Sequence, residues 1–202
     1  MTSLLPRHQC HTALEHMTRD TQLFERRHLC CEYYIWPQPR LTYRYAQSSA
    51  DLPADETPRD SAQRYTGGGI VYHCPGDIVL CCILDYHTPG LPRRLRDKIT
   101  GVQTHIQTVM AYHNRHLLTK TPQTSRDITF CQTYHSPYEL YYNQDKAVAL
   151  SLRTDRKLIM IQGIIHCQST QVFFPLAPVA TQGLHPEALS TLLADLNRYD
   201  PV

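Results

Sequence analysis

Residues 64–73 read Arg64-Tyr65-Thr66-Gly67-Gly68-Gly69-Ile70-Val71-Tyr72-His73, and no other segment says more about the structure of this chain. Three of its eight glycines stand together here. Clustered glycine permits positive φ angles and a close approach to the backbone. The aromatic and β-branched residues that follow are typical of a strand, and the preceding arginine is a planar cation suited to a carboxylate or phosphate. The segment predicts a binding loop that leads into a strand, with a wide hairpin loop as the alternative.

Motifs and charge exclude several classes of partner. The glycines lack both the Gly-Lys-Ser/Thr ending of a Walker A loop and the Gly-x-Gly-x-x-Gly spacing of a dinucleotide site. The net charge is +2, and the 20 basic residues are scattered, so no nucleic-acid partner is predicted. The chain has no long apolar run typical of a membrane span and no apolar secretory segment after Met1. We therefore expect no membrane association and a cytoplasmic protein.

The length suits one domain over residues 1–202 with a real hydrophobic core. Hydrophobic periodicity predicts helices over 11–29, 93–117 and 186–198. Strands are predicted over 32–37, 41–46, 69–73, 78–86, 147–153, 157–166 and 170–175. The clearest hairpin signal surrounds Thr154-Asp155-Arg156, and strands and helices mix without strict alternation, which favours an α+β fold.

The eight cysteines are not expected to form a disulfide framework. Two adjacent pairs, 30/31 and 81/82, place neighbouring thiols on opposite faces of a strand, and reduced thiols are expected. His8, Cys10 and His11 form the best metal-binding cluster, but no second Cys/His pair stands at zinc-site distance, so no metal is predicted.

The glycine segment, with the pattern Arg-x-Thr-Gly-Gly-Gly-x-Val-Tyr-His, resembles the signature of the lipoate-protein ligases and octanoyl transferases, which are relatives of the biotin-protein ligases. Residues 13–20 resemble the opening helix of that family, residues 34–47 its first long strand, and residues 154–158 its lysine-bearing hairpin. The resemblance implies a biotin/lipoate ligase-like catalytic domain with mixed, mainly antiparallel sheets flanked by helices. The ligases of this family often carry a small additional C-terminal domain, and because this chain ends after one predicted helix we expect that domain to be missing or separate.

The resemblance also implies a set of binding residues. The acyl pocket would be lined by Arg64, Tyr72 and His73 and walled by Gly67, Gly68 and Gly69. Gly76 and Asp77 resemble the step near the phosphate and magnesium site of the ligases, although Pro-Gly-Asp is also good turn chemistry by itself.

Lys157 is the first candidate catalytic residue. It follows a turn and opens a strand, where a fixed cation could stabilise charge on an acyl carbonyl or an adenylate phosphate; the family resemblance implies that it contacts the activated acyl group. The family continues Lys-x-x-Gly-x-Ala-Gln, whereas this chain has Met160 at the glycine position. A side chain there could narrow the pocket.

Cys131 is the second candidate. Residues 131–140 resemble the cysteine loop of one octanoyl transferase branch, in which Cys131, Ser136 and Glu139 match the family spacing. A thioester nucleophile needs a thiolate, which a nearby cation favours. A buried structural thiol is the alternative interpretation.

Three functions follow from the resemblance. The first is a ligase that uses ATP and Mg²⁺ to activate lipoate or octanoate as an acyl-adenylate for transfer to a lysine. The acceptor would be a lipoyl domain of a dehydrogenase E2 or a glycine-cleavage H-type protein. The second is a transferase that uses a thioester donor and Cys131 without ATP. The third is a binding protein that kept the fold and lost the chemistry.

Overall fold

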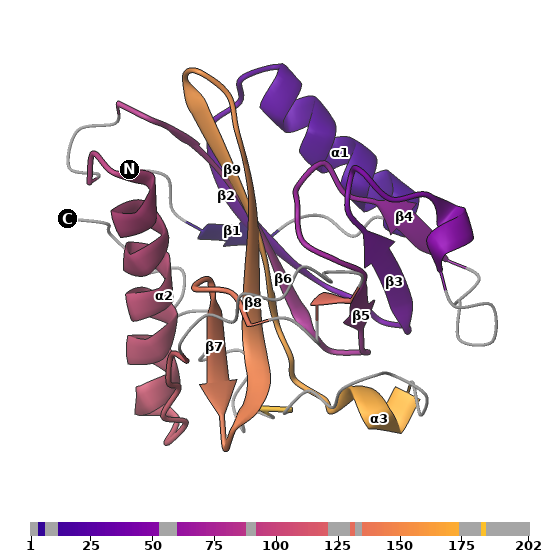
Figure 1. Ribbon diagram of the computed structural model, residues 1–202, viewed down its shortest axis with the longest axis vertical. Helices are drawn as coiled ribbons and strands as arrows, with labels where there is room; N and C mark the ends of the chain where they lie inside the picture. The colour runs from indigo at the N-terminus through magenta and orange to yellow at the C-terminus, as the bar shows by residue number, and fades with distance from the viewer. Residues whose placement is uncertain are drawn as a thin grey trace.

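The computed structural model describes residues 4–6, 12–52, 60–87, 92–120, 130–131, 135–173 and 183–184. The larger sheet has the strand order β1-β2-β6-β9-β8-β7 (Figure 1). These strands are β1 (Leu4–Pro6), β2 (Cys30–Ile35), β6 (Ile78–Asp85), β9 (Leu158–Ile165), β8 (Asp145–Thr154) and β7 (Glu139–Tyr142). Only the β1–β2 pair in this sheet is parallel among the described strands.

A smaller sheet carries the end of the glycine segment. It has the order β4-β3-β5, from β4 (Ser61–Gln63), β3 (Arg40–Tyr43) and β5 (Val71–His73). Strand β3 runs parallel to β4 and antiparallel to β5. The remaining elements are α1 (Ala13–Glu25), the 3-10 turn η1 (Ser49–Asp51), α2 (Leu95–Tyr112) and α3 (Thr170–Phe173).

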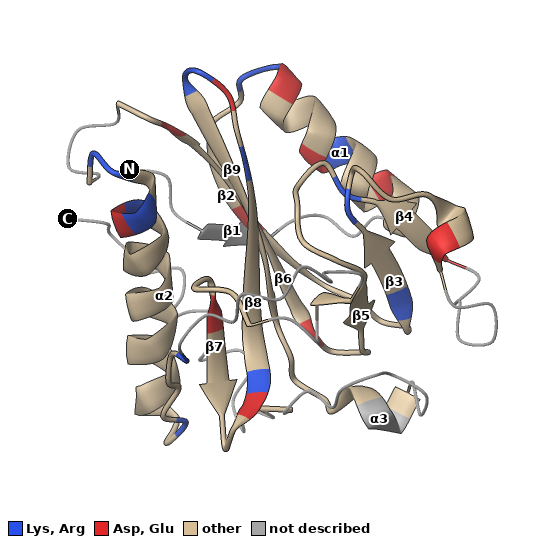
Figure 2. Ribbon diagram, in the orientation of Figure 1, with Lys and Arg blue, Asp and Glu red and all other residues tan. Residues whose placement is uncertain are grey.

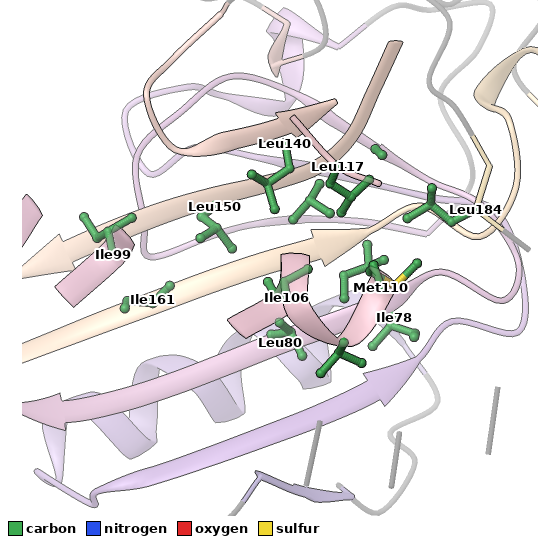
Figure 3. Close-up of a cluster of buried hydrophobic side chains, with 14 of the residues drawn as sticks. Ile78, Leu80, Ile99, Ile106, Met110, Leu117, Leu140, Leu150, Ile161 and Leu184 are labelled. Carbon is green, nitrogen blue, oxygen red and sulfur yellow. The ribbon is translucent and has the colours of Figure 1, made fainter. Parts of the chain in front are cut away.

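Helix α2 covers one face of the larger sheet. Its Ile99, Ile106 and Met110 side chains are almost completely buried and join Leu80, Leu150 and Ile161 of the central strands in the largest core cluster (Figure 3). Figure 2 shows that α2 carries charged residues only in its first turn. Burial of this apolar stripe, rather than helix propensity alone, therefore holds α2 in place.

Helix α1 and the smaller sheet cover the opposite face (Figure 1). A capping box starts α1, because the Thr12 hydroxyl accepts a hydrogen bond from the Glu15 amide while the Glu15 carboxylate accepts one from the Thr12 amide. Ala13 and Met17 then pack with Tyr34, Trp36 and Val79. A three-layer arrangement results, in which the larger sheet lies between α2 and the α1 side.

Most predicted elements are confirmed. The fold is α+β with mainly antiparallel sheets flanked by helices. Strands β8 and β9 form the predicted hairpin around Thr154-Asp155-Arg156, and the apolar run of β6 is largely buried. None of the described helices is long and apolar enough to cross a membrane.

One predicted strand is wrong. Residues 170–173 form the short helix α3 instead of a strand. Phe173 packs against the buried cluster of Leu41 and Tyr72 on the smaller sheet, so tertiary packing overrides the β-propensity of this segment. The helix predicted over 186–198 and the cluster of His8, Cys10 and His11 lie outside the described residues. The interpretation of residues 1–202 as one domain stays a prediction.

Candidate functional site

A cavity of about 670 Å³ lies on the face of the larger sheet opposite α2. Its walls come from the glycine segment, β8, β9 and the chain that leads into β7. The lining residues include Gly67–Gly69, Val71, His73, Cys131, Ser136–Glu139, Ala149–Leu152 and Gln162–Ile164, with Met17, Arg64 and Val79. A volume in the range of about 300–1,000 Å³ is typical of small-molecule sites.

Arg64 fixes the shape of the glycine segment. Its Nη2 donates hydrogen bonds to the carbonyls of Gly67 (3.1 Å) and Gly69 (2.7 Å), and its Nη1 donates to the Thr42 hydroxyl (2.7 Å). Gly68 has a φ of +93°, and a Cβ there would lie 3.4 Å from Arg64 Nη2. The left-handed backbone favours glycine at this position, whereas the contact with the guanidinium would be an ordinary van der Waals contact.

The charge of Arg64 is held away from water. Burial lowers its pKa from 12.5 to about 10, so it stays cationic at neutral pH. Its Nε is buried and has no hydrogen-bond partner among the described residues. The cavity wall therefore contains a fixed positive charge with one donor still to be satisfied.

His73 lies beside this arginine as a neutral ring. Its Nε2 is hydrogen bonded to the Thr42 hydroxyl (2.8 Å), and its ring stacks on Trp36 with centroids 4.8 Å apart. Burial, followed by the charge of Arg64, holds its pKa well below 6.5. Thr42 thus connects Arg64 to His73, and the structure brings both predicted binding residues to the same wall.

Cys131 lies in the part of the cavity wall that faces β8. Its amide donates to the Ile70 carbonyl (2.8 Å), which attaches it to the end of the glycine segment. Its side chain packs against Val71, Ala149 and Ile164. Burial and the Glu139 carboxylate raise its pKa above 9.0, whereas Lys146, Arg64 and a hydrogen bond from the Gly69 amide lower it. The resting residue is a thiol, with Lys146, Arg64 and the Gly69 amide placed to stabilise a thiolate and the Glu139 carboxylate opposing them.

Lys146 is the functional candidate that sequence reasoning missed. Its ammonium donates to the Cys131 carbonyl and forms an ion pair with the Glu139 carboxylate at 2.7 Å. The same carboxylate accepts hydrogen bonds from the Tyr141 hydroxyl (2.6 Å) and the Ser136 amide (3.0 Å). Both charged side chains are about 2% exposed. This network links the residues that match the cysteine-loop pattern, Cys131, Ser136 and Glu139, to a buried cation.

A β-bulge places Lys146 on the same side of β8 as Ala149. The register of β7 against β8 shifts between Leu140 and Tyr141, and both Lys146 and Ala149 contact Cys131. Strict alternation would send residues three apart to opposite faces, and a bulge removes that restriction. The turn before it, Asn143-Gln144, has positive φ at both residues, as a two-residue hairpin of type I′ requires.

Lys157 does not line the cavity. It stands at the tip of the β8–β9 hairpin with an exposed side chain, and its amide donates to the Asp155 carboxylate (2.6 Å). A catalytic role for Lys157 stays a prediction, and its position argues against it. Met160 is also outside the cavity, because its side chain is buried against Phe24 and Cys30. The expected narrowing of the pocket by Met160 therefore does not occur.

Three further predicted binding residues also lie outside the cavity lining. Tyr72 is fully buried and stacks on Phe130 with centroids 6.2 Å apart. Asp77 is fully buried as well. Its carboxylate accepts hydrogen bonds from the amides of Cys74 and Cys167 and contacts His166 Nδ1. Gly76 has a φ of +86°, as a tight turn requires. The Gly76–Asp77 step thus has the geometry of a turn, and its occupied carboxylate does not fit a magnesium ligand.

Comparison with solved structures defines the class of fold. The chain has the fold of the lipoate-protein ligases. No protein-family profile and no curated protein sequence matches it.

Three solved structures show the extent of this similarity. Protein Ta0514 of T. acidophilum, assigned as a lipoate protein ligase and solved with lipoic acid bound, is 11% identical, with a TM-score of 0.73 over 97% of this chain and 82% of its own. Lipoate-protein ligase A bound with ATP is 11% identical, with a TM-score of 0.72 over 97% and 83%. LipL1 of P. falciparum, in complex with lipoate, is 13% identical, with a TM-score of 0.64 over 96% and 60%.

Proposed function

We propose that this protein transfers an octanoyl or lipoyl group from a thioester donor to a lysine of an acceptor domain, with Cys131 as the nucleophile. The observation that carries the proposal is the position of Cys131 in the cavity wall, with the Gly69 amide, Arg64 and Lys146 around it. The thioester alternative is preferred to the acyl-adenylate ligase because the lysine beside the cavity residue Cys131 is Lys146, whereas Lys157 is exposed at the hairpin tip.

The lining of the cavity favours an acyl chain as the substrate. Val71, Val79, Ala149, Leu152 and Ile164 supply apolar surface, against which methylene groups are stabilised by about 0.8 kcal/mol each when buried. Ta0514 was solved with lipoic acid. A related structure from Thermoplasma acidophilum describes a bipartite lipoate protein ligase and its E2 lipoyl domain. These likenesses support a lipoyl domain, or an H-type protein, as the acceptor.

The reaction proceeds in two transfers. The Cys131 thiolate attacks the carbonyl carbon of the donor thioester, the donor carbon–sulfur bond breaks, and the proton lost by Cys131 goes to the departing thiolate. The acceptor amine then attacks the Cys131 thioester, so that an amide forms and Cys131 takes up the proton released by the amine. Both steps place negative charge on the carbonyl oxygen, which positively charged and N–H groups in a water-poor site stabilise.

An ATP-dependent ligase is the second candidate, because lipoate-protein ligase A, which has the same fold, was solved with ATP. The predicted Gly76–Asp77 site does not support it, since both carboxylate oxygens of Asp77 are already hydrogen bonded within the protein. In this candidate ATP would supply the energy to activate a free acid, and Arg64 would hold the anionic product.

The test is acylation of a lipoyl domain, followed by intact mass. One arm supplies an octanoyl thioester and the other supplies octanoate with ATP and magnesium. We expect modification with the thioester only, and a hydroxylamine-sensitive octanoyl adduct on the enzyme. Cys131→Ser should abolish both signals, whereas Cys74→Ser, which changes a cysteine outside the cavity lining, should retain them.

The other outcomes separate the alternatives. Transfer that requires ATP and survives Cys131→Ser would identify a ligase. The absence of transfer from either donor would favour a protein that kept the fold as a binding module.

A further inference from the structure

Two cysteines outside the cavity lining face each other across strands β2 and β6. The antiparallel register places Cys31 directly opposite Cys82. Opposed residues of such a pair have Cα atoms about 4.5–5.5 Å apart, and a disulfide requires about 4.4–6.8 Å. The backbone therefore already holds this pair at bonding distance.

The two side chains also lie on the same face of the sheet, because directly opposed residues of neighbouring strands point the same way. The Cys82 side chain is hydrogen bonded to Cys31, and this contact, followed by burial, raises the pKa of Cys82. Their chain neighbours differ, because Cys30 and Cys81 belong to the buried cluster around Phe24 on the α1 side.

Access from solvent distinguishes this pair from the other thiols of the sheet. Cys31 and Cys82 are both partly exposed, whereas Cys30 and Cys81 are buried. They pack against the edge of the large core cluster on the α2 side of the sheet. A small disulfide therefore has readier access to the Cys31–Cys82 pair than to the buried Cys30 and Cys81 thiols.

We propose that Cys31 and Cys82 form a redox-active dithiol, which a low-molecular-weight disulfide such as glutathione disulfide oxidises to a cross-strand disulfide. The Cys31 thiolate attacks one sulfur of the oxidant and releases one glutathione thiolate. The Cys82 thiolate then attacks the Cys31 sulfur of the mixed disulfide and releases the second. The two protein protons go to the two glutathione thiolates, so two thiols are oxidised and one disulfide is reduced.

The bond would connect an outer strand to the centre of the larger sheet. Cys82 pairs with Ile161 on β9 as well as with Cys31 on β2. The next residues of β9, Gln162 and Gly163, line the cavity. The disulfide would therefore lie one strand away from the cavity wall, and the proposal does not depend on the function assigned to that cavity.

The test is exposure of the reduced, folded protein to glutathione disulfide, followed by alkylation and intact mass. We expect the Cys31 and Cys82 peptides to be joined with the loss of two hydrogen atoms and to carry no glutathione, whether or not Cys131 takes up an adduct. Cys30→Ser and Cys81→Ser are the matched controls and should behave in the same way. Cys31→Ser and Cys82→Ser should instead retain one glutathione on the remaining thiol.

Fragmentation of the cross-linked peptides from the natural sequence assigns the bond independently of whether every variant folds. A bond between Cys31 and Cys82 supports the proposal. A cross-link that persists in Cys31→Ser, a different pairing in the fragments, or stable glutathione adducts on Cys31 or Cys82 of the natural protein would each overturn it.

Discussion

Lys146 and Lys157 stand near opposite ends of the same hairpin strand, and the structure gives them opposite environments. Each follows a polar turn and begins an apolar strand segment. Lys146 is 3% exposed and is held between Glu139 and the Cys131 carbonyl. Lys157 is exposed at the hairpin tip, where its backbone amide bonds to Asp155. Figure 2 shows basic residues at both ends of β8.

The contrast shows that the sequence pattern of a turn followed by a lysine does not reveal whether the lysine is solvated or buried. Local sequence places a cation at the start of a strand, but only the neighbouring elements decide whether that cation is solvated or buried. The residues around Lys146 come from β7 and from the segment that carries Cys131. Chemistry in this fold is therefore expected at the β7–β8 end of the strand rather than at the β8–β9 tip.

Replacing each lysine with methionine tests this contrast most directly. Lys146→Met leaves the Glu139 carboxylate buried without its cation, and such a loss typically costs about 3–5 kcal/mol in the free energy of unfolding. We expect acyl transfer to be abolished as well. Lys157→Met should change stability by no more than about 0.5 kcal/mol and should retain transfer. Urea unfolding measures the stability of each variant, and intact mass measures acyl transfer to the acceptor. Loss of transfer in a stable Lys157→Met variant would restore Lys157 as the catalytic lysine.

A double variant separates the structural role of Lys146 from its chemical role. Glu139→Gln removes the unpaired charge left by Lys146→Met, while its amide oxygen can still accept from the Tyr141 hydroxyl. We expect the double variant to recover most of the lost stability and none of the transfer activity. Recovery of both in the same assays would mean that Lys146 only maintains the fold.

Gly163→Ala tests the wall that β8 and β9 share. A Cβ at Gly163 would lie 2.5 Å from Leu150 Cδ2, so Leu150 would have to move, at a cost of about 1–3 kcal/mol. We expect a lower unfolding midpoint and slower transfer of longer acyl chains relative to octanoyl. The control is Gly67→Ala, whose Cβ would meet only the Leu152 carbonyl at 3.9 Å. Equal loss of stability in both variants would contradict the role of this contact.

The smallest effect is expected at the hairpin tip. Hydrogen bonds from the Lys157 and Leu158 amides lower the pKa of Asp155 below 3.8. Because the folded pKa lies below the unfolded value, this stabilisation is complete above pH 3.8 and is lost as the pH falls through the folded pKa. Asp155→Asn should reduce stability slightly at neutral pH, show no difference in strong acid and leave transfer unchanged. A pH series of urea unfolding curves measures this.

Local patterns predicted the framework of the fold well. The glycine run with Arg64, the apolar stripe of α2 and the turn at Thr154-Asp155-Arg156 each carry their signal within a few residues. The spacing of Cys131, Ser136 and Glu139 also placed three residues that line one cavity. These features were accessible because a short segment determines each of them.

Sequence reasoning failed for residues whose role depends on the direction in which the side chain points. His73 and Val71 line the cavity, whereas Tyr72 between them does not, as the alternation of a strand requires. Lys146 was missed for the opposite reason, since the register shift of β7 against β8 breaks that alternation. Asp77 looked like a cation ligand, but its carboxylate is hydrogen bonded to residues 90 positions away in the chain and to the adjacent turn.

Arg64 also determines the electrostatic potential of the ligand-free cavity. Among the described residues its guanidinium donates only to neutral acceptors, a hydroxyl and two carbonyls. A full charge compensated by dipoles alone leaves a positive potential over the surrounding wall. The cavity can therefore discriminate by charge between two ligands whose acyl chains have the same length, which its apolar walls alone could not do. An anionic head group would be preferred to an uncharged one even before any side chain moves.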